Sequence, residues 1–132
     1  MYLMIRYLKN KRGQAVVEFA LILPVLMLLV VGILEFGIIM NQYMVVNEAA
    51  REGARSAALG NTNATVTAIA TAAASPINTS QLTVAISPTA SRTSGSQVTV
   101  TVSNPVQAIT TLISPFFPTG FKVQGVATMR ME

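Results

Sequence analysis

A long apolar run at residues 14–40 limits what this chain can fold into more than any other feature. Between Phe19 and Leu34 the run contains no charged residue. A helix from Phe19 to Met40 would be about 33 Å long, and the hydrocarbon core of a bilayer is about 30 Å thick. The run therefore predicts a helix that crosses a membrane.

A cleaved secretory signal peptide is the competing interpretation of this run. The apolar part of such a peptide is shorter, and a cleavage site made of small residues follows it. Here Phe36-Gly37-Ile38-Ile39 continues the apolar pattern, and helix-forming sequence follows. We therefore favour a helix that is retained in the mature protein.

The net positive charge of the chain lies in front of the apolar run. The net charge is +4, and Arg6, Lys9, Lys11 and Arg12 precede residue 14 without an acidic residue among them. The other five basic residues are balanced by the five acidic ones. A basic flank beside an apolar segment is typical of the cytoplasmic side of a membrane helix, whereas nucleic-acid binding requires a basic folded face. We expect contact with membrane lipid and no nucleic-acid partner.

The helical pattern continues beyond the membrane segment. Residues 41–59 are amphipathic, with a stripe of small apolar residues and two oppositely charged pairs, Glu48–Arg51 and Glu52–Arg55. No proline occurs between residues 25 and 75, and Gly60-Asn61 suits a helix terminus. We expect one continuous helix over about residues 14–59, whose distal half projects into water.

The remainder of the chain predicts an α+β fold. Residues 62–74 fit a short second helix, capped by Asn61 or Thr62 and ended by Ser75-Pro76. Period-two alternation then indicates a small antiparallel sheet of about three strands, at residues 82–87, 98–103 and 121–130. The first two strands suit a hairpin, and residues 106–120 suit a helical turn and a loop that covers the sheet.

These patterns divide the chain into three expected parts. They are a basic leader at residues 1–13, a membrane and assembly helix at residues 14–59, and an extracellular α+β domain at residues 60–132.

The composition argues against an enzyme, because the chain contains neither histidine nor cysteine. Neither a glycine-rich phosphate loop nor a cluster of metal ligands occurs in it. We therefore expect no catalytic residue, no metal site and no cofactor.

The spacing of Gly13, Gln14 and Glu18 carries the functional hypothesis. Glycine ends the basic leader, and the glutamate follows five residues later inside the apolar segment. A carboxylate at the centre of a membrane helix costs about 2.5 kcal/mol or more, so it marks a functional site by default. Cleavage after Gly13 would free an α-amine on Gln14, which could pair with Glu18 of a neighbouring helix and offset the burial of both charges.

Residues 10–59, and more loosely the whole chain, resemble the TadE-like pilins and pseudopilins of tight-adherence (Flp-type) systems, within the type IV pilin superfamily. The resemblance is carried by Arg12-Gly13-Gln14-Ala15, Val17-Glu18-Phe19-Ala20, Pro24, Gly32, Glu35-Phe36-Gly37 and Ala49-Ala50-Arg51-Glu52-Gly53-Ala54-Arg55. The combination of these motifs over about fifty residues is specific, whereas the C-terminal strands are less distinctive. The major Flp pilins are usually much shorter, so the C-terminal domain argues against that subclass.

The resemblance implies a structural role in a type IV pilus, in cell adhesion or secretion. A prepilin peptidase would cut after Gly13, and Glu18 would direct processing and assembly. The subunit would wait in the inner membrane as a precursor and then enter or prime an extracellular, cell-surface filament. Its expected partners are the peptidase, the inner-membrane assembly platform, and copies of itself or other pilins. A membrane-anchored extracellular interaction module that does not polymerise is the alternative.

Several of the residues expected to act in assembly can also be explained without a contact between subunits. The full expected set is Glu18, Phe19, Pro24, Gly32, Glu35, Gly37, Arg51, Glu52 and Arg55. Glu18 could reach an interface without a partner. Glu35 could mark the outer membrane boundary, or pair with Arg51 or Arg55 of a neighbour.

The proline, the glycines and the distal charged residues have similar alternatives. Pro24 removes one helix hydrogen bond, so it predicts a kink or a point of local melting. Gly32 and Gly37 predict close contact between helices, although Gly32 could simply be tolerated in the helix. Arg51, Glu52 and Arg55 fit a solvated helix face and a contact between subunits equally well.

Overall fold

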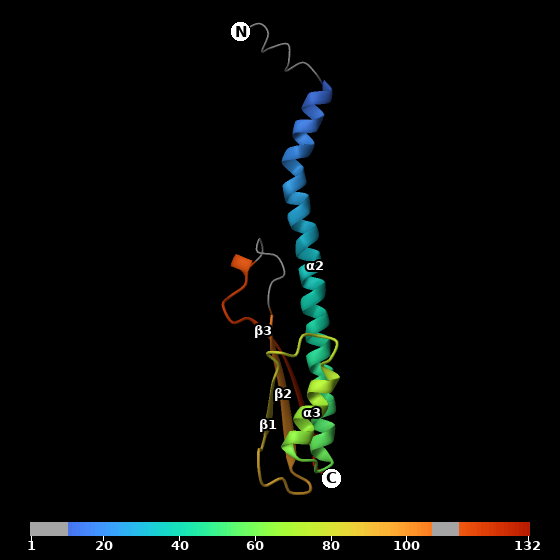
Figure 1. Cartoon of the computed structure of the whole chain (residues 1–132), viewed down its shortest axis with the longest axis vertical. Helices are drawn as coiled ribbons and strands as arrows, with labels where there is room; N and C mark the ends of the chain where they lie inside the picture. Colours follow the sequence, from blue (N-terminus) through green and yellow to red (C-terminus); the bar gives the residue numbers. More distant parts are fainter. Residues whose placement is uncertain (1–10, 107–113) are drawn as a thin grey trace. The chain divides into compact units, whose positions relative to one another are not determined.

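The structure, a computed structural model, describes residues 11–106 and 114–132 (Figure 1). It contains two α-helices, α2 (Lys11–Ala58) and α3 (Asn63–Ala73), and three strands, β1 (Thr83–Ser87), β2 (Gln97–Pro105) and β3 (Lys122–Arg130). A short 3-10 helix, η1 (Ser114–Phe116), precedes β3. The predicted α+β fold with a three-stranded antiparallel sheet is confirmed.

The chain divides into two compact units, Met1–Glu35 and Phe36–Glu132, and the division falls inside α2. The first unit contributes the apolar part of the helix. The second contains the end of α2, α3 and the sheet. The predicted division at residues 13 and 59 rests on processing and on membrane position, and it remains a prediction.

Helix α2 is longer than predicted at its start, because it includes Gly13 and the two residues before it. It ends one residue earlier than expected, at Ala58. The Asn61 N–H donates to the Ser56 carbonyl (3.4 Å), and Gly60 adopts a φ of 80°. This is the glycine-terminated helix end that Gly60-Asn61 predicts, because glycine enters the left-handed region without steric cost.

Helix α3 follows the cap that the sequence indicates. Thr62 is the N-cap, and its hydroxyl accepts a hydrogen bond from the Thr65 N–H at 3.3 Å. Val66 and Ala70 are buried, and Ala74 is the C-cap just before Ser75-Pro76. The second helix is therefore confirmed, with its apolar side in the core.

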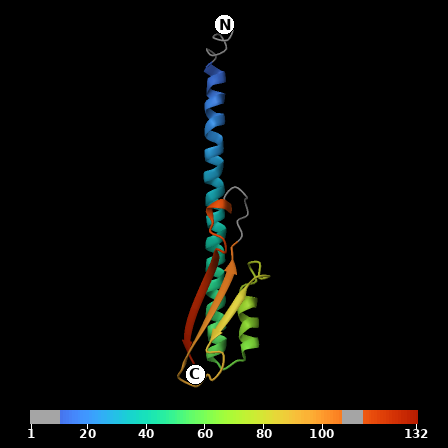
Figure 2. The same cartoon turned by 90° about the vertical axis from the view of Figure 1, so that its left-hand side faces the viewer.

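The sheet has the strand order β1-β2-β3, and both pairs are antiparallel (Figure 2). Val84 faces Val102 across the first pair, and Val102 faces Gly125 across the second. The predicted hairpin of the first two strands is confirmed. Alternation is clearest in β2, where Val98, Val100 and Val102 are fully buried and the residues between them are half-buried.

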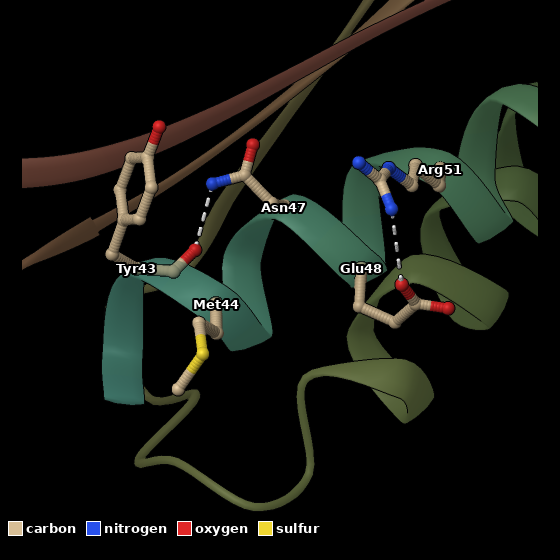
Figure 3. A pocket seen from close by; sticks show the side chains of 5 residues that line it. All are labelled: Tyr43, Met44, Asn47, Glu48 and Arg51. Carbon is tan, nitrogen blue, oxygen red and sulfur yellow. Dashed lines mark hydrogen bonds and ion pairs between the residues drawn. The ribbon is translucent and has the colours of Figure 1, made fainter. Parts of the chain in front are cut away.

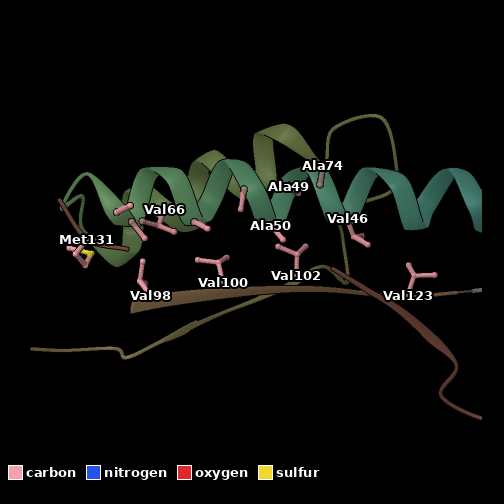
Figure 4. Packing of buried hydrophobic residues seen from close by; sticks show 14 residues of the cluster. Val46, Ala49, Ala50, Val66, Ala74, Val98, Val100, Val102, Val123 and Met131 are labelled. Atoms are coloured by element: carbon pink, nitrogen blue, oxygen red, sulfur yellow. The ribbon is translucent and has the colours of Figure 1, made fainter. Parts of the chain in front are cut away.

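The core lies between the sheet and the part of α2 that belongs to the second unit (Figure 4). Side chains of α2 and of β2 point toward each other there. The helix contributes small buried residues, namely Val46, Ala49, Ala50, Gly53, Ala54 and Ala57. Small side chains let the helix backbone approach the strands closely, and the valines of β2 fill the remaining space.

The connection between β2 and β3 differs in part from the expectation. Residues 114–116 do form a helical turn, but Phe116 is 79% exposed and does not cover the sheet. The apolar residues Ile109, Leu112 and Ile113 of the same predicted patch lie outside the described residues.

Candidate processing and assembly helix

The predicted processing residues lie in the first turns of α2. Gly13, Gln14 and Glu18 are all exposed. The Gln14 side-chain amide donates to the Glu18 carboxylate, with 3.1 Å between Nε2 and Oε1. Residues four apart meet on one helix face, so the side chains of positions 14 and 18 are adjacent within a single chain.

Gly13 has no packing role in the described part of the chain. A Cβ atom added at this position would meet no heavy atom within 4 Å. The backbone at Gly13 is helical, so it does not need the conformational freedom of glycine. A glycine inside a helix costs about 1 kcal/mol relative to alanine, and nothing within the described fold repays that cost.

Between Phe19 and Leu34, most apolar side chains of α2 are exposed. Large apolar residues at successive positions, including Phe19, Leu21, Ile22, Val25, Leu28 and Leu29, are all exposed. A helix that is apolar all round is stable in a membrane or inside a bundle of helices. By length and composition α2 can cross a membrane, and this apolar helix suits membrane anchoring.

Pro24 and Gly32 lie within this open segment. Pro24 is accommodated inside α2, although it lacks the N–H that would donate to the carbonyl of Ala20. Added Cβ atoms at Gly32 and at Gly37 would meet no heavy atom within 4 Å. The close helix contacts predicted for these glycines are therefore not contacts within the described fold.

The two glutamates of the apolar run differ sharply in burial. Glu18 is exposed, whereas Glu35 is only 4% exposed. Glu35 is the last residue of the first unit. Sequence reasoning expected either a membrane boundary or an ion pair with a neighbour at this position, and it did not anticipate burial.

The surface of α2 beside the buried small residues carries the charged residues Arg51, Glu52 and Arg55. Arg51 and Arg55 are exposed and Glu52 is half-buried, while Ala50, Gly53 and Ala54 face the core. Arg51 Nη1 lies 4.0 Å from Glu48 Oε2, so the first predicted pair is present. In the part of the chain that the structure describes, the second predicted pair, Glu52–Arg55, is not formed.

A groove of 370 Å³ runs along this outer face of α2 (Figure 3). It is lined by Tyr43, Met44, Asn47, Glu48 and Arg51. The Asn47 side chain donates to the Tyr43 carbonyl at 2.8 Å, which holds it against the helix. The groove combines an apolar end with a charged end.

Sequence reasoning placed Arg51 in a possible contact between subunits, but it missed the rest of this groove. Tyr43, Asn47 and Arg51 recur every four residues, which is the spacing of one helix face. This spacing could have identified the groove, because the buried residues Val46, Ala49 and Ala50 lie to one side of that face.

Comparison with known proteins relates about a third of the chain to one family. Residues 13–55 match the model of the TadE-like protein family. Neither the comparison with curated proteins nor that with solved structures found a match. The matched range contains Gly13, Glu18, Pro24 and the segment from Ala49 to Arg55. The chain therefore carries a TadE-like region at residues 13–55, the family that its motifs resemble.

Proposed function

We propose that this chain is a pilin-like subunit that is cut after Gly13 and assembles into, or primes, a Tad-type pilus through α2. The observation that carries the proposal is an exposed carboxylate, Glu18, at the start of an open apolar helix within the TadE-like region. A prepilin peptidase and an inner-membrane assembly platform are the partners that this proposal requires. The unprocessed chain resides in the inner membrane, and the assembled subunit is extracellular.

The cut creates the charge that Glu18 needs. Hydrolysis of the Gly13–Gln14 peptide bond leaves a carboxylate on Gly13 and an α-amine on Gln14, which is protonated near neutral pH. Within one chain, Glu18 accepts a hydrogen bond from the neutral amide of Gln14. After the cut, the new cation pairs with Glu18 of a neighbouring helix, where burial among apolar side chains strengthens the attraction.

The cut also removes the net charge of the chain. Four basic residues leave with the leader, and five basic and five acidic residues remain. Self-repulsion between copies falls accordingly. A neutral subunit with an open apolar helix suits dense packing against copies of itself or other pilins.

The position of the cut is tested by mass spectrometry of the protein from cells that contain the peptidase. We expect a mature N-terminus at Gln14. A matched variant, Gly32→Ala, alters a glycine elsewhere in α2 and should be processed normally, whereas Gly13→Leu should accumulate uncut. A stable full-length protein in cells with active peptidase would contradict the proposal.

The role of Glu18 is tested by a pair of neighbouring substitutions. Glu18→Ala should insert into the membrane but yield no filaments, because the new α-amine lacks a partner. Gln14→Ala removes the side-chain amide and keeps the α-amine, so filaments should still form. Electron microscopy of sheared material measures both, and normal filaments from Glu18→Ala would rule out the ion-pair mechanism.

A membrane-anchored module that does not polymerise is the second candidate. The observation in its favour is that the family match ends at residue 55, whereas the folded second unit continues to Glu132. In that case shearing releases no filament, and all of the protein remains in the membrane fraction. The same shearing experiment on the unmodified chain therefore separates the two candidates.

A further inference from the structure

Strand β3 and helix α2 run in the same direction within the second unit. Gly125, near the start of β3, lies against the backbone of Val46 and Asn47. At the other end, the Glu132 N–H donates to the Ala58 carbonyl at 3.1 Å. The residues that precede β3 therefore lie beyond Val46, toward the start of the second unit at Phe36.

The distance along the strand places this loop more closely. Phe121 precedes Gly125 by four residues, or about 13 Å of extended chain. A length of about 13 Å along an α-helix corresponds to about nine residues, which brings Phe121 level with about residue 37. Figures 1 and 2 both show η1 at about the height of this part of α2. The helix exposes apolar side chains here too, at Phe36, Ile38 and Met40.

The tip of the loop is aromatic, and backbone hydrogen bonds fold it into turns. Phe116 is 79% exposed, and the Phe117 and Phe121 rings are in contact, with centroids 5.5 Å apart. The Phe117 N–H donates to the Ser114 carbonyl (3.2 Å), and the Phe121 N–H donates to the Pro118 carbonyl (3.1 Å). The Val106 N–H donates to the Phe121 carbonyl (2.9 Å), which extends the ladder of β2 and β3 to the base of the loop.

The loop itself is uncharged, and a lysine follows it directly. Residues 114–121 contain no charged side chain, and the exposed Lys122 follows immediately. A cation directly beside exposed apolar rings matches the boundary between acyl chains and anionic headgroups, where long basic side chains extend toward water.

We propose that the aromatic loop, residues 114–121, inserts into the outer surface of the lipid bilayer that holds α2. Phe116 enters the acyl region, and Lys122 meets the headgroups. Continuity favours lipid over a second copy of the chain, because the continuous apolar run of α2 reaches this level and ends at Met40, where the polar Asn41 and Gln42 follow. The proposal rests on the membrane-anchored stage of the proposed function and is independent of polymerisation.

Tryptophan fluorescence provides the test, because the chain contains no tryptophan. Phe116→Trp is introduced into the full chain and reconstituted in phosphatidylcholine–phosphatidylglycerol vesicles with brominated acyl chains, which quench nearby indoles. Leu29→Trp in the apolar segment is the positive control. Val126→Trp, at a residue 56% exposed on the outer face of β3, is the matched control for an exposed apolar position.

We expect a blue-shifted, strongly quenched emission from Phe116→Trp, closer to that of Leu29→Trp than to that of Val126→Trp. Quenching of Leu29→Trp alone would overturn the loop insertion and leave membrane anchoring intact. A Phe116→Trp emission that shifts with the protein-to-lipid ratio but is not quenched would assign the loop to a second copy and also overturn the proposal. Absence of quenching in all three variants would contradict anchoring itself.

Discussion

Helix α2 contains glycines both in its exposed apolar segment and in the part that packs in the second unit, and their surroundings differ. In the apolar segment, Gly32 has open space around the position of a Cβ atom. In the second unit, a Cβ atom on Gly53 would lie 3.0 Å from Val100 Cγ1 and 3.3 Å from the Ala70 Cβ. The glycine of the second unit thus serves packing within the chain, whereas that of the apolar segment has no such contact.

This difference separates folding from assembly along the helix. The small residues from Ala49 to Ala57 are explained by the sheet and by α3, which they contact at short range. The open glycines and the exposed Glu18 have no comparable explanation within the described fold. Substitutions at buried positions of the second unit should therefore change the free energy of unfolding. Substitutions at exposed positions of α2 should mainly change assembly.

Gly125→Ala should have the largest effect on stability. The added Cβ would overlap the backbone of Val46 and Asn47, and a helix backbone cannot move aside without disturbing the whole core. We expect a loss of about 3 kcal/mol or more in the free energy of unfolding. Urea unfolding of the full chain in detergent micelles, followed by circular dichroism, measures it. Val126→Ala, at the adjacent exposed position, is the control, and equal stability of the two variants would contradict the close helix–strand packing.

Val100→Ala should be the next most damaging change. Val100 is fully buried in the central strand, and it contacts the position of Gly53. The loss of two buried methyl groups costs about 2 kcal/mol. The same unfolding measurement applies, and Thr101→Ala on the opposite face of β2 should cost clearly less. If the Val100→Ala variant is as stable as the parent, Val100 does not belong to the core.

Gly53→Ala should cost less, about 1 kcal/mol, because the steric contact with a valine side chain is partly offset by better helix propensity. Its sign should depend on Val100. In a chain that already carries Val100→Ala, the added methyl group fills part of the cavity, so Gly53→Ala should become neutral or stabilising. A double-mutant cycle measures this coupling. Additive effects would show that the two residues do not share a contact.

Much of this fold can be predicted from local sequence patterns. The α3 cap at Thr62, the end of α2 at Gly60 and the alternation of Val98, Val100 and Val102 each follow from short-range chemistry. The contact of Gly125 with Val46 could not be predicted, because it joins residues far apart in the sequence and depends on the side of α2 that the sheet covers.

In the candidate site, the sequence indicates which residues matter, but it does not indicate which of them are buried or exposed. The spacing of Gly13 and Glu18 is visible in the sequence, and the family match over residues 13–55 supports its interpretation. The burial of Glu35 was not predictable, because a charge in an apolar run suggests exposure or a partner in another chain. The exposure of Phe116 was missed for the opposite reason, since a proline-flanked aromatic cluster resembles a cover for a core.

Gly37→Ala should have the smallest effect on stability and should sharpen the comparison most. Gly37 belongs to the second unit, but no heavy atom lies within 4 Å of an added Cβ. Alanine should therefore leave the free energy of unfolding unchanged or raise it by at most about 1 kcal/mol, the gain in helix propensity. If neighbouring helices pack against this glycine in a filament, the methyl group keeps their backbones apart, and filament yield after shearing should fall although the monomer is stable. Unfolding in micelles and imaging of sheared material measure the two effects on the same variant. A destabilised Gly37→Ala chain would show that the open face packs within the fold, and normal filaments would remove Gly37 from the assembly surface.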